Sequence, residues 1–422
     1  MRQNERFLTV FAIPALLLIG WTSAARAEDW PAWRGPRGDG SSREHGIPTE
    51  WDGPEERNVA WETALPGVGH ASPIVWGDRI FLASCQTEKQ QRLLVCVDRS
   101  RGEILWERIV LQAPLERMHR LNSHASSTPA TDGQLVYVTF LDRDQMMVAA
   151  YDFDGNRRWE VRPDPFSSRH GYCSSVTLFE NLVILNGDHD GDSFLVALNR
   201  DTGETVWKTA RENRTRSYCT PLIRQIGGRR QMVLSGNKCV ASYDPRDGSR
   251  HWIIDGPTEQ FVASMVYNGE LFFMTAGFPD YHIMAIRPDG QGNVTDTHVA
   301  WRTTRGHTYV PSPALSDDGR YLLLVSDEGI ASCFDAATGK RHWVERIGPH
   351  YSASPIVVEG LVHFLSDEGI TKIIRPGPEF ALVAENRLGE QCYASPAVSQ
   401  GRIYFRSTRH LVCIGPGPVE GE

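Results

Sequence analysis

The chain has 422 residues, of which 41% are hydrophobic and 23% charged, and its formal net charge is −8. A chain this acidic is not suited to neutralising phosphates, so nucleic acid is not an expected partner. Its eight cysteines include no C-x-x-C pair, which excludes zinc-ribbon and thioredoxin-like signatures.

The N-terminal residues, 1–27, have the three parts of a secretory signal. Arg2 and Arg6 precede an apolar run that ends at Trp21, and Ala25-Arg26-Ala27 has the A-x-A form of a cleavage site. The run is shorter than the ~20 residues that a spanning helix needs, and no later segment is apolar enough to span. We therefore expect a cleaved signal peptide and a periplasmic or secreted chain that does not span the membrane. Its mature form would lose three arginines and one glutamate, and its net charge would be −8 − (3 − 1) = −10.

The first of two alternating patterns has the form A-x-D-x-x-x-G-x-x-x-W, with substitutions at its first positions. The copy that ends at Trp159 is one residue shorter, and the copy that ends at Trp301 is stretched. The Gly permits a tight turn, and the flat Trp fills the space between repeats, so the pattern indicates packing. Copies end at Trp106, Trp159, Trp207, Trp252, Trp301 and Trp343.

The second pattern is a step of small residues, often Ser/Thr-Pro, before a β-rich run. Each unit then reads as four short strands separated by Gly, Asp and Asn turns, and four strands at this period are typical of a propeller blade. We therefore predict an all-β fold, an eight-bladed β-propeller of four-stranded antiparallel blades over residues 58–415. A lead-in segment, 28–57, precedes it, and a tail, 416–422, follows. The steps are Ser72-Pro73, Thr128-Pro129, Ser174-Ser175, Thr220-Pro221, Ser264-Met265, Ser312-Pro313, Ser354-Pro355 and Ser395-Pro396.

The last unit contains only three strands and lacks a Trp strand. The segment 58–62 supplies a candidate, because Trp61 precedes Trp106 by one normal repeat. We predict that this N-terminal strand completes the last blade and closes the ring, which removes free sheet edges. The seventh unit has no Trp, and residues 380–384 are expected to take its place.

The A-x-D-x-x-x-G-x-x-x-W spacing resembles the tryptophan-docking repeat of the quinoprotein alcohol and glucose dehydrogenases and of BamB, the propeller subunit of the outer-membrane barrel-assembly machinery. The resemblance covers Trp61 to about Ile414. It implies the fold, and it implies either a quinone cofactor with Ca²⁺ at one channel mouth or a protein-binding role. This chain departs from the dehydrogenases because it has no two adjacent cysteines. It also lacks the lipidated cysteine that BamB-like proteins carry.

A set of polar side chains stands just before each inner strand, so it should ring one mouth of the central channel. Imidazoles, phenols and a guanidinium could bind a carboxylated or phenolic ligand, and two or three histidines could bind a metal. The alternative is a polar lining of a water-filled channel. The set comprises His70, His124, His170, Tyr172, Arg216, Tyr218, Gln260, His307, Tyr309, His350, Tyr351, Gln391 and Tyr393.

Two further features have a functional and a structural interpretation. Asp188, Asp190 and Asp192 alternate in a loop of the third unit and are a calcium candidate, although an ordinary hairpin turn is the favoured interpretation. Cys173 and Cys219 both follow a tyrosine in neighbouring units, and a disulfide between them is an alternative to two free thiols.

The sequence favours an exported monomer that acts as a non-catalytic scaffold and binds an envelope protein or a small ligand at the channel mouth. We assign no catalytic residue. The alternatives are an oxidoreductase with pyrroloquinoline quinone and calcium in the mouth, and a propeller that binds carbohydrate or another small ligand there.

Overall fold

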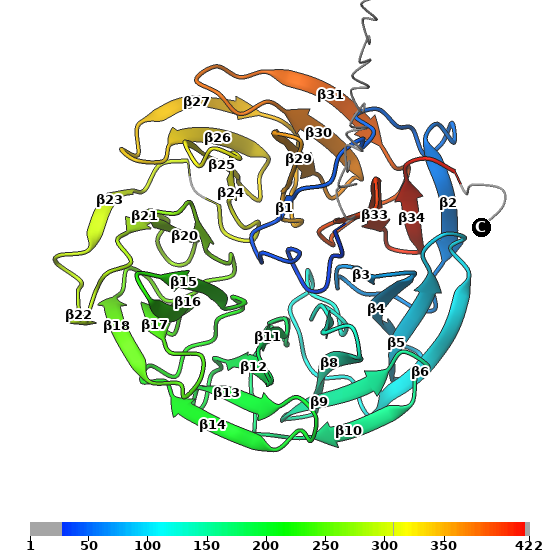
Figure 1. Cartoon of the computed structure of the whole chain (residues 1–422), viewed down its shortest axis with the longest axis horizontal. Coiled ribbons are helices and arrows are strands. Elements are labelled where there is room, and N and C mark those ends of the chain that lie inside the picture. Colours follow the sequence, from blue (N-terminus) through cyan, green and yellow to red (C-terminus); the bar gives the residue numbers. More distant parts are fainter. Residues whose placement is uncertain (1–27, 307, 418–422) are drawn as a thin grey trace, which may run out of the picture.

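The computed structural model describes residues 28–306 and 308–417, and all its regular elements there are β-strands. They form eight sheets around a central axis, which confirms the predicted eight-bladed propeller (Figure 1). The predicted signal peptide, His307 and most of the predicted tail lie outside the described residues. No helix in the described ranges is long and apolar enough to cross a membrane.

The first four blades follow chain order, and each runs from its inner strand to its outer strand. Blade 1 contains β3 (Ile74–Trp76), β4 (Arg79–Gln86), β5 (Gln91–Asp98) and β6 (Ile104–Gln112). Blade 2 contains β7 (Ala130–Thr131), β8 (Leu135–Asp142), β9 (Gln145–Asp152) and β10 (Arg157–Val161). Blade 3 contains β11 (Thr177–Phe179), β12 (Leu182–Gly187), β13 (Phe194–Asn199) and β14 (Thr205–Ala210). Blade 4 contains β15 (Leu222–Ile226), β16 (Arg229–Gly236), β17 (Cys239–Tyr243) and β18 (Arg250–Asp255).

The other four blades repeat this plan with additions from elsewhere in the chain. Blade 5 contains β19 (Val266–Tyr267), β20 (Phe272–Ala276), β21 (His282–Ile286) and β23 (Val299–Thr303), and its inserted β22 (Gly292–Asn293) pairs with β18. Blade 6 contains β24 (Ala314–Leu315), β25 (Tyr321–Val325), β26 (Ile330–Asp335) and β27 (Arg341–Arg346). Blade 7 contains β28 (Ile356–Val358), β29 (Leu361–Leu365), β30 (Ile370–Ile374) and β31 (Leu382–Arg387), and β1 (Ser41–Ser42) joins it in parallel. Blade 8 contains β32 (Ala397–Ser399), β33 (Arg402–Arg406), β34 (His410–Ile414) and, as its outer strand, β2 (Val59–Ala64).

Burial along the strands follows from the way the blades stack. The middle strands, such as β4 and β8, are buried on both faces because each blade is covered by two neighbours. The outer strands alternate, as in β6, because one of their faces meets water. The core is therefore a ring of inter-blade layers.

The Ser and Thr of the sequence steps form a hoop of hydrogen bonds around the channel. The backbone N–H of each donates to the hydroxyl oxygen of the next, at 2.9–3.3 Å, across seven of the eight blade junctions. Each member stands two residues before its inner strand. In blade 3 the member is Ser175, the second residue of its step. The hoop residues are Ser72, Thr128, Ser175, Thr220, Ser264, Ser312, Ser354 and Ser395.

The repeated Trp side chains lock each blade onto the next. In six of the seven repeats, the indole N–H donates to a backbone carbonyl of the following blade. In four of these six the ring covers the Gly of that blade's turn, so a Cβ at Gly339 would lie 2.6 Å from Trp301. Trp252 is the exception, because β22 covers it and its N–H donates to Gln231 of its own blade.

Blade 7 has no repeat Trp, and the lead-in segment supplies one. Trp51 is 1% exposed and lies between His363 of blade 7 and Phe405 of blade 8. Phe380 instead meets Trp343 at the junction of blades 6 and 7. The expectation that residues 380–384 replace the missing Trp is therefore corrected.

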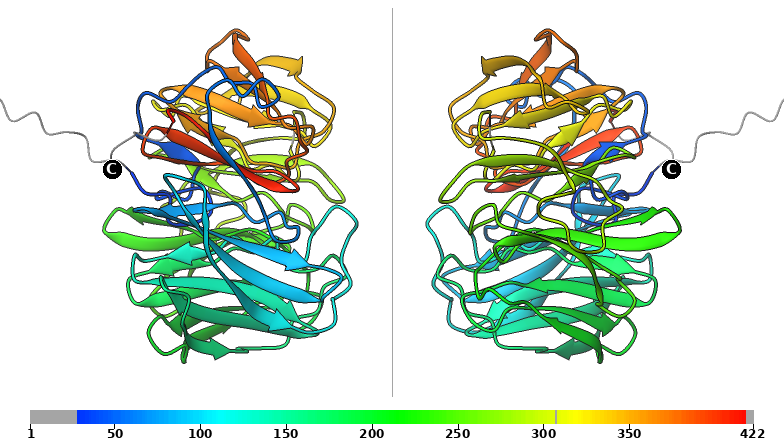
Figure 2. Two further views of the ribbon diagram at one scale, coloured as in Figure 1. Left: turned by 90° about the vertical axis from the view of Figure 1, so that its right-hand side faces the viewer. Right: turned by 90° about the vertical axis from the view of Figure 1, so that its left-hand side faces the viewer.

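The lead-in segment, residues 28–57, also crosses one mouth of the channel (Figures 1 and 2). Trp30 pairs with Val75 of β3, Thr131 of β7 donates to Pro31, and β1 pairs with β28. Arg34 is buried and donates to the carbonyl oxygens of Pro313 and Pro355 in blades 6 and 7. The lead-in thus binds inner strands on opposite sides of the ring.

Candidate functional site

The predicted ring of polar side chains lies at the mouth opposite the lead-in segment. Strands of a blade alternate in direction, so loops that enter the inner strands share one face with the hairpins that join the two middle strands. In chain order, the ring residues come before the hoop residues, and the inner-strand residues that contact the lead-in come after them. The ring and the lead-in therefore lie at opposite mouths. We call the face with the ring residues the ring face.

One ring contact joins the first and last blades. His70 packs on Tyr393 with ring centroids 4.7 Å apart. Burial, with the Arg406 guanidinium nearby, lowers the pKa of His70 to about 4, so its imidazole is neutral near pH 7. Arg406 is itself buried and donates to the carbonyl oxygens of Ala71 and Ala83. This group therefore holds blades 8 and 1 together.

A second group lies on blades 2 to 4. Arg216 donates to Nδ1 of His170 at 3.4 Å and forms an ion pair with Asp190 at 2.5 Å. Tyr218 lies beside His170, and its hydroxyl is 3.2 Å from Ser168 Oγ. Burial, followed by the charge of Arg216, lowers the pKa of His170. The structure thus brings together three of the predicted ring residues.

A third group joins blades 5 and 6, where Tyr309 donates to Oε1 of Gln260 at 3.0 Å. Burial and the nearby Asp327 raise the pKa of Tyr309 to about 12. The carboxylate of Asp327 accepts the backbone N–H groups of Tyr309 and Val310, so it supports this loop.

Asp367 supports the corresponding loop of blade 7, where it accepts the N–H of Ser352. The carbonyl oxygens of His350 and Gln391 accept backbone N–H groups there and in blade 8. These two ring residues therefore stabilise the loops through their backbone.

Three predicted ring residues point into the protein. Tyr172 and Tyr351 are 4% and 1% exposed and belong to inter-blade cores. His124 Nδ1 lies 3.3 Å from Oε1 of Glu116, which also pairs with the buried Arg92. Burial opposes ionisation of Glu116, but His124 and Arg92 hold its pKa below the usual value. Sequence reasoning missed Glu116, whose one signal was its place in a long loop eight residues before His124.

The three aspartates of the calcium candidate point to three different arginines. Asp188 forms a buried pair with Arg211, whose guanidinium reaches both carboxylate oxygens at 2.9 and 3.0 Å. Asp190 pairs with Arg216, and Asp192 pairs with Arg214 at 2.7 Å. The structure does not bring these carboxylates together around one position.

Within the described ranges, only Glu62, Glu390 and His410 place three metal-ligand atoms within 4.8 Å of one another. The guanidinium of Arg409 already donates to the Glu390 carboxylate at 2.9 Å, so this carboxylate is paired with a side chain. All eight cysteines are free. Cys219 is within 3.1 Å of the carbonyl oxygen of Ala263, and burial raises the pKa of both Cys173 and Cys219.

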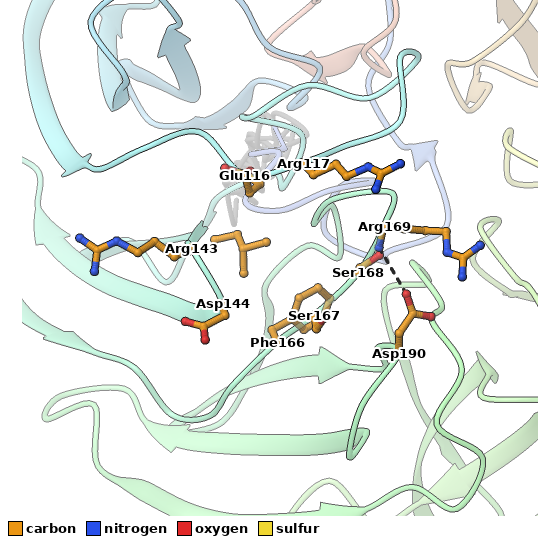
Figure 3. Close-up of a pocket in the computed structure, with 10 residues that line it drawn as sticks. Glu116, Arg117, Arg143, Asp144, Phe166, Ser167, Ser168, Arg169 and Asp190 are labelled. Carbon is orange, nitrogen blue, oxygen red and sulfur yellow. Dashed lines mark hydrogen bonds between the residues drawn. The ribbon is translucent and has the colours of Figure 1, made fainter.

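A pocket of about 570 Å³ opens on the ring face between blades 2 and 3 (Figure 3). Its charged lining consists of Glu116, Arg117, Arg143, Asp144, Arg169 and Asp190. Figure 3 shows the side chains of Arg117 and Arg169 extending to the same side, whereas Arg143 extends to the other. Apart from Asp190, none of these residues belongs to a pattern that the sequence repeats, so the pocket was not predicted.

The fold and this face define a propeller of tryptophan-docked blades, one channel mouth of which is covered by an N-terminal segment. A family model described as outer membrane protein assembly factor BamB matches residues 53–181, 89–266 and 148–375, and the chain belongs to that family. The matches overlap because the sequence repeats.

Solved structures of two functional kinds are similar in fold. BamB from Moraxella catarrhalis is 13% identical, with a TM-score of 0.61 over 84% of this chain and 99% of that chain. Quinohemoprotein alcohol dehydrogenase from Comamonas testosteroni is 13% identical, with a TM-score of 0.68 over 95% and 83%. A europium-containing methanol dehydrogenase is 10% identical, with a TM-score of 0.66 over 90% and 89%. The comparison with curated proteins finds no significant match.

The ring face does not offer the donor set that a calcium-bound quinone needs. A calcium ion requires several free oxygen ligands. Here Asp190 is held by Arg216, while Asp327 and Asp367 accept backbone N–H groups. These carboxylates are therefore engaged in holding the loops, and the residues do not fit that cofactor.

Proposed function

We propose that this chain is exported to the cell envelope and acts there as a monomeric, non-catalytic scaffold that binds a partner protein through its ring face. The supporting observation is the distribution of exposed apolar side chains. Among the described residues, the large hydrophobic side chains exposed outside strands are Val68, Leu121, Phe278 and Tyr281, and all four stand in ring-face loops. Exposed apolar side chains on one face offer a docking partner apolar surface to bury.

The lead-in segment supports the same assignment. It covers the opposite mouth with buried contacts, including Arg34 and Trp30, so that mouth is closed by the chain itself. Membership of a family described as an outer-membrane assembly factor agrees with a role in the envelope.

Photo-crosslinking in intact cells tests this proposal. A photoreactive amino acid at Leu121 or Phe278 should capture the same partner, because both side chains are exposed on the ring face. The control site is Gln134, an exposed residue on the opposite face. Capture of the partner from Gln134 alone, or of no partner from either ring-face site, would overturn the proposal.

Export has its own test. N-terminal sequencing of the chain recovered from the envelope fraction should begin at Glu28. Retention of residues 1–27 or recovery only from the cytoplasm would contradict export.

The rival oxidoreductase is tested with pyrroloquinoline quinone and calcium. The purified protein should show no rise in melting temperature with the two together, since Asp190, Asp327 and Asp367 of the ring face are already engaged. A saturable rise that requires both components would favour the oxidoreductase.

A further inference from the structure

The loops of blades 2 to 4 on the ring face hold an excess of unpaired arginines. Arg117, Arg120, Arg143 and Arg169 are exposed or half-exposed and form no ion pair within the described residues. Three of them line the 570 Å³ pocket. Such an excess is unexpected on a chain whose formal net charge is −8.

The carboxylates nearby do not neutralise these arginines, because nearly all of them have another partner. Glu116 is held by Arg92, Asp190 by Arg216 and Asp192 by Arg214. Of the acidic groups that line the pocket, only Asp144 forms no ion pair. The pocket therefore carries an uncompensated positive charge.

The pocket also contains groups suited to recognising carboxylates. An arginine donates two parallel N–H groups to a carboxylate, which is stronger and more directional than a lysine contact. Ser167 and Ser168 line the same pocket and supply hydroxyl donors. Leu121, the most exposed large hydrophobic side chain of the described residues at 61%, stands in the same loop as Arg117. Arginine is one of the residue types enriched in interface hot spots.

We propose that this arginine pocket binds an acidic peptide segment of the partner protein, with Arg117 and Arg169 pairing with its carboxylates. The proposal rests on the scaffold function and adds the chemistry of the partner. The volume matches the 300–1,000 Å³ typical of ligand pockets, and it accommodates a few side chains at a time.

The test uses the purified full chain and a fluorescent decaglutamate peptide, with decaglutamine as the neutral comparison. Anisotropy at low ionic strength should show binding of decaglutamate that weakens with added salt. The double variant Arg117→Glu/Arg169→Glu should weaken that binding roughly tenfold or more, since two charge-assisted contacts become repulsive. Arg341→Glu makes one such charge reversal, half the change of the double variant, on β27 far around the ring, and should alter the affinity by less than about twofold.

Equal losses of binding free energy per reversed charge in the double variant and in Arg341→Glu would overturn the proposal, because they would show attraction to overall charge. Absence of decaglutamate binding at low salt would also overturn it. Melting curves establish that each variant is folded. Crosslinking from Leu121 reports separately on the scaffold: a captured partner without decaglutamate binding defeats the arginine pocket alone, whereas failure to capture any partner defeats the scaffold itself.

Discussion

The indole of Trp51 stacks on the imidazole of His363, with ring centroids 6.3 Å apart and 15° between the planes. Trp51 belongs to the lead-in segment, and His363 belongs to blade 7. The pair occupies the junction where the repeat provides no Trp, and the backbone N–H of Trp51 donates to Oδ1 of Asn386 in β31. An N-terminal segment thus completes a contact that the other blades make with their own outer strands.

Replacing this indole should open a cavity between blades 7 and 8. We expect Trp51→Ala to lower the free energy of unfolding by about 3–5 kcal/mol, the range for large aromatic truncations in cores. Trp33→Ala, which truncates a half-buried lead-in Trp, is the comparison and should cost less. Denaturant unfolding measures both, and equal losses would refute the role given to Trp51.

The fold was predictable because its signals are local and repeated. The Gly and Trp of the pattern lie within eleven residues in most copies, and each step recurs once per blade. The repeats of a single chain can therefore be aligned with one another. Trp51 was not predictable, since it occurs once and meets His363 across more than 300 residues.

The directions of the ring side chains were predicted less well than the fold. Tyr172 and Tyr351 stand three residues before the hoop and turn into the core, whereas Tyr218 and Tyr393 stand two before it and meet histidines. A shift of one residue reverses the side of an extended chain, although Tyr309, also three residues before the hoop, is only half-buried and bonds Gln260. The sequence also does not reveal that Asp188 pairs with Arg211, because ion pairs between loops depend on tertiary packing.

The glycines of the repeat allow a matched test of tryptophan docking. Gly339 and Gly401 have φ of 71° and 73°, so an alanine incurs the same backbone strain of about 1 kcal/mol at each. A Cβ at Gly339 would meet Trp301 at 2.6 Å, whereas nothing lies within 4 Å at Gly401. Gly339→Ala should therefore destabilise the protein by about 1–3 kcal/mol more than Gly401→Ala. Equal melting temperatures would contradict the docking role.

The hydroxyl hoop should be detectable at single amides. The variant Ser264→Ala removes the acceptor of the Thr220 N–H and leaves that half-buried donor unpaired, at a cost of about 1–3 kcal/mol. Hydrogen exchange at Thr220 should accelerate relative to wild type. Ser249→Ala, at an exposed turn of blade 4, is the control and should leave that exchange rate unchanged.

Acid should weaken the same junction that Trp51 fills. Burial lowers the pKa of His363 from 6.5 to about 4, so between these pH values the unfolded chain binds a proton that the folded chain does not. The stability due to neutral His363 is therefore present above pH 6.5 and is lost as the pH falls, by at most about 1.4 kcal/mol per pH unit. His363→Phe keeps an aromatic ring against Trp51 and should flatten the fall in unfolding free energy between pH 6.5 and 5. His45→Gln, at an exposed histidine of the lead-in, should leave the slope as in wild type, and an unchanged slope in His363→Phe would show that His363 does not titrate with folding.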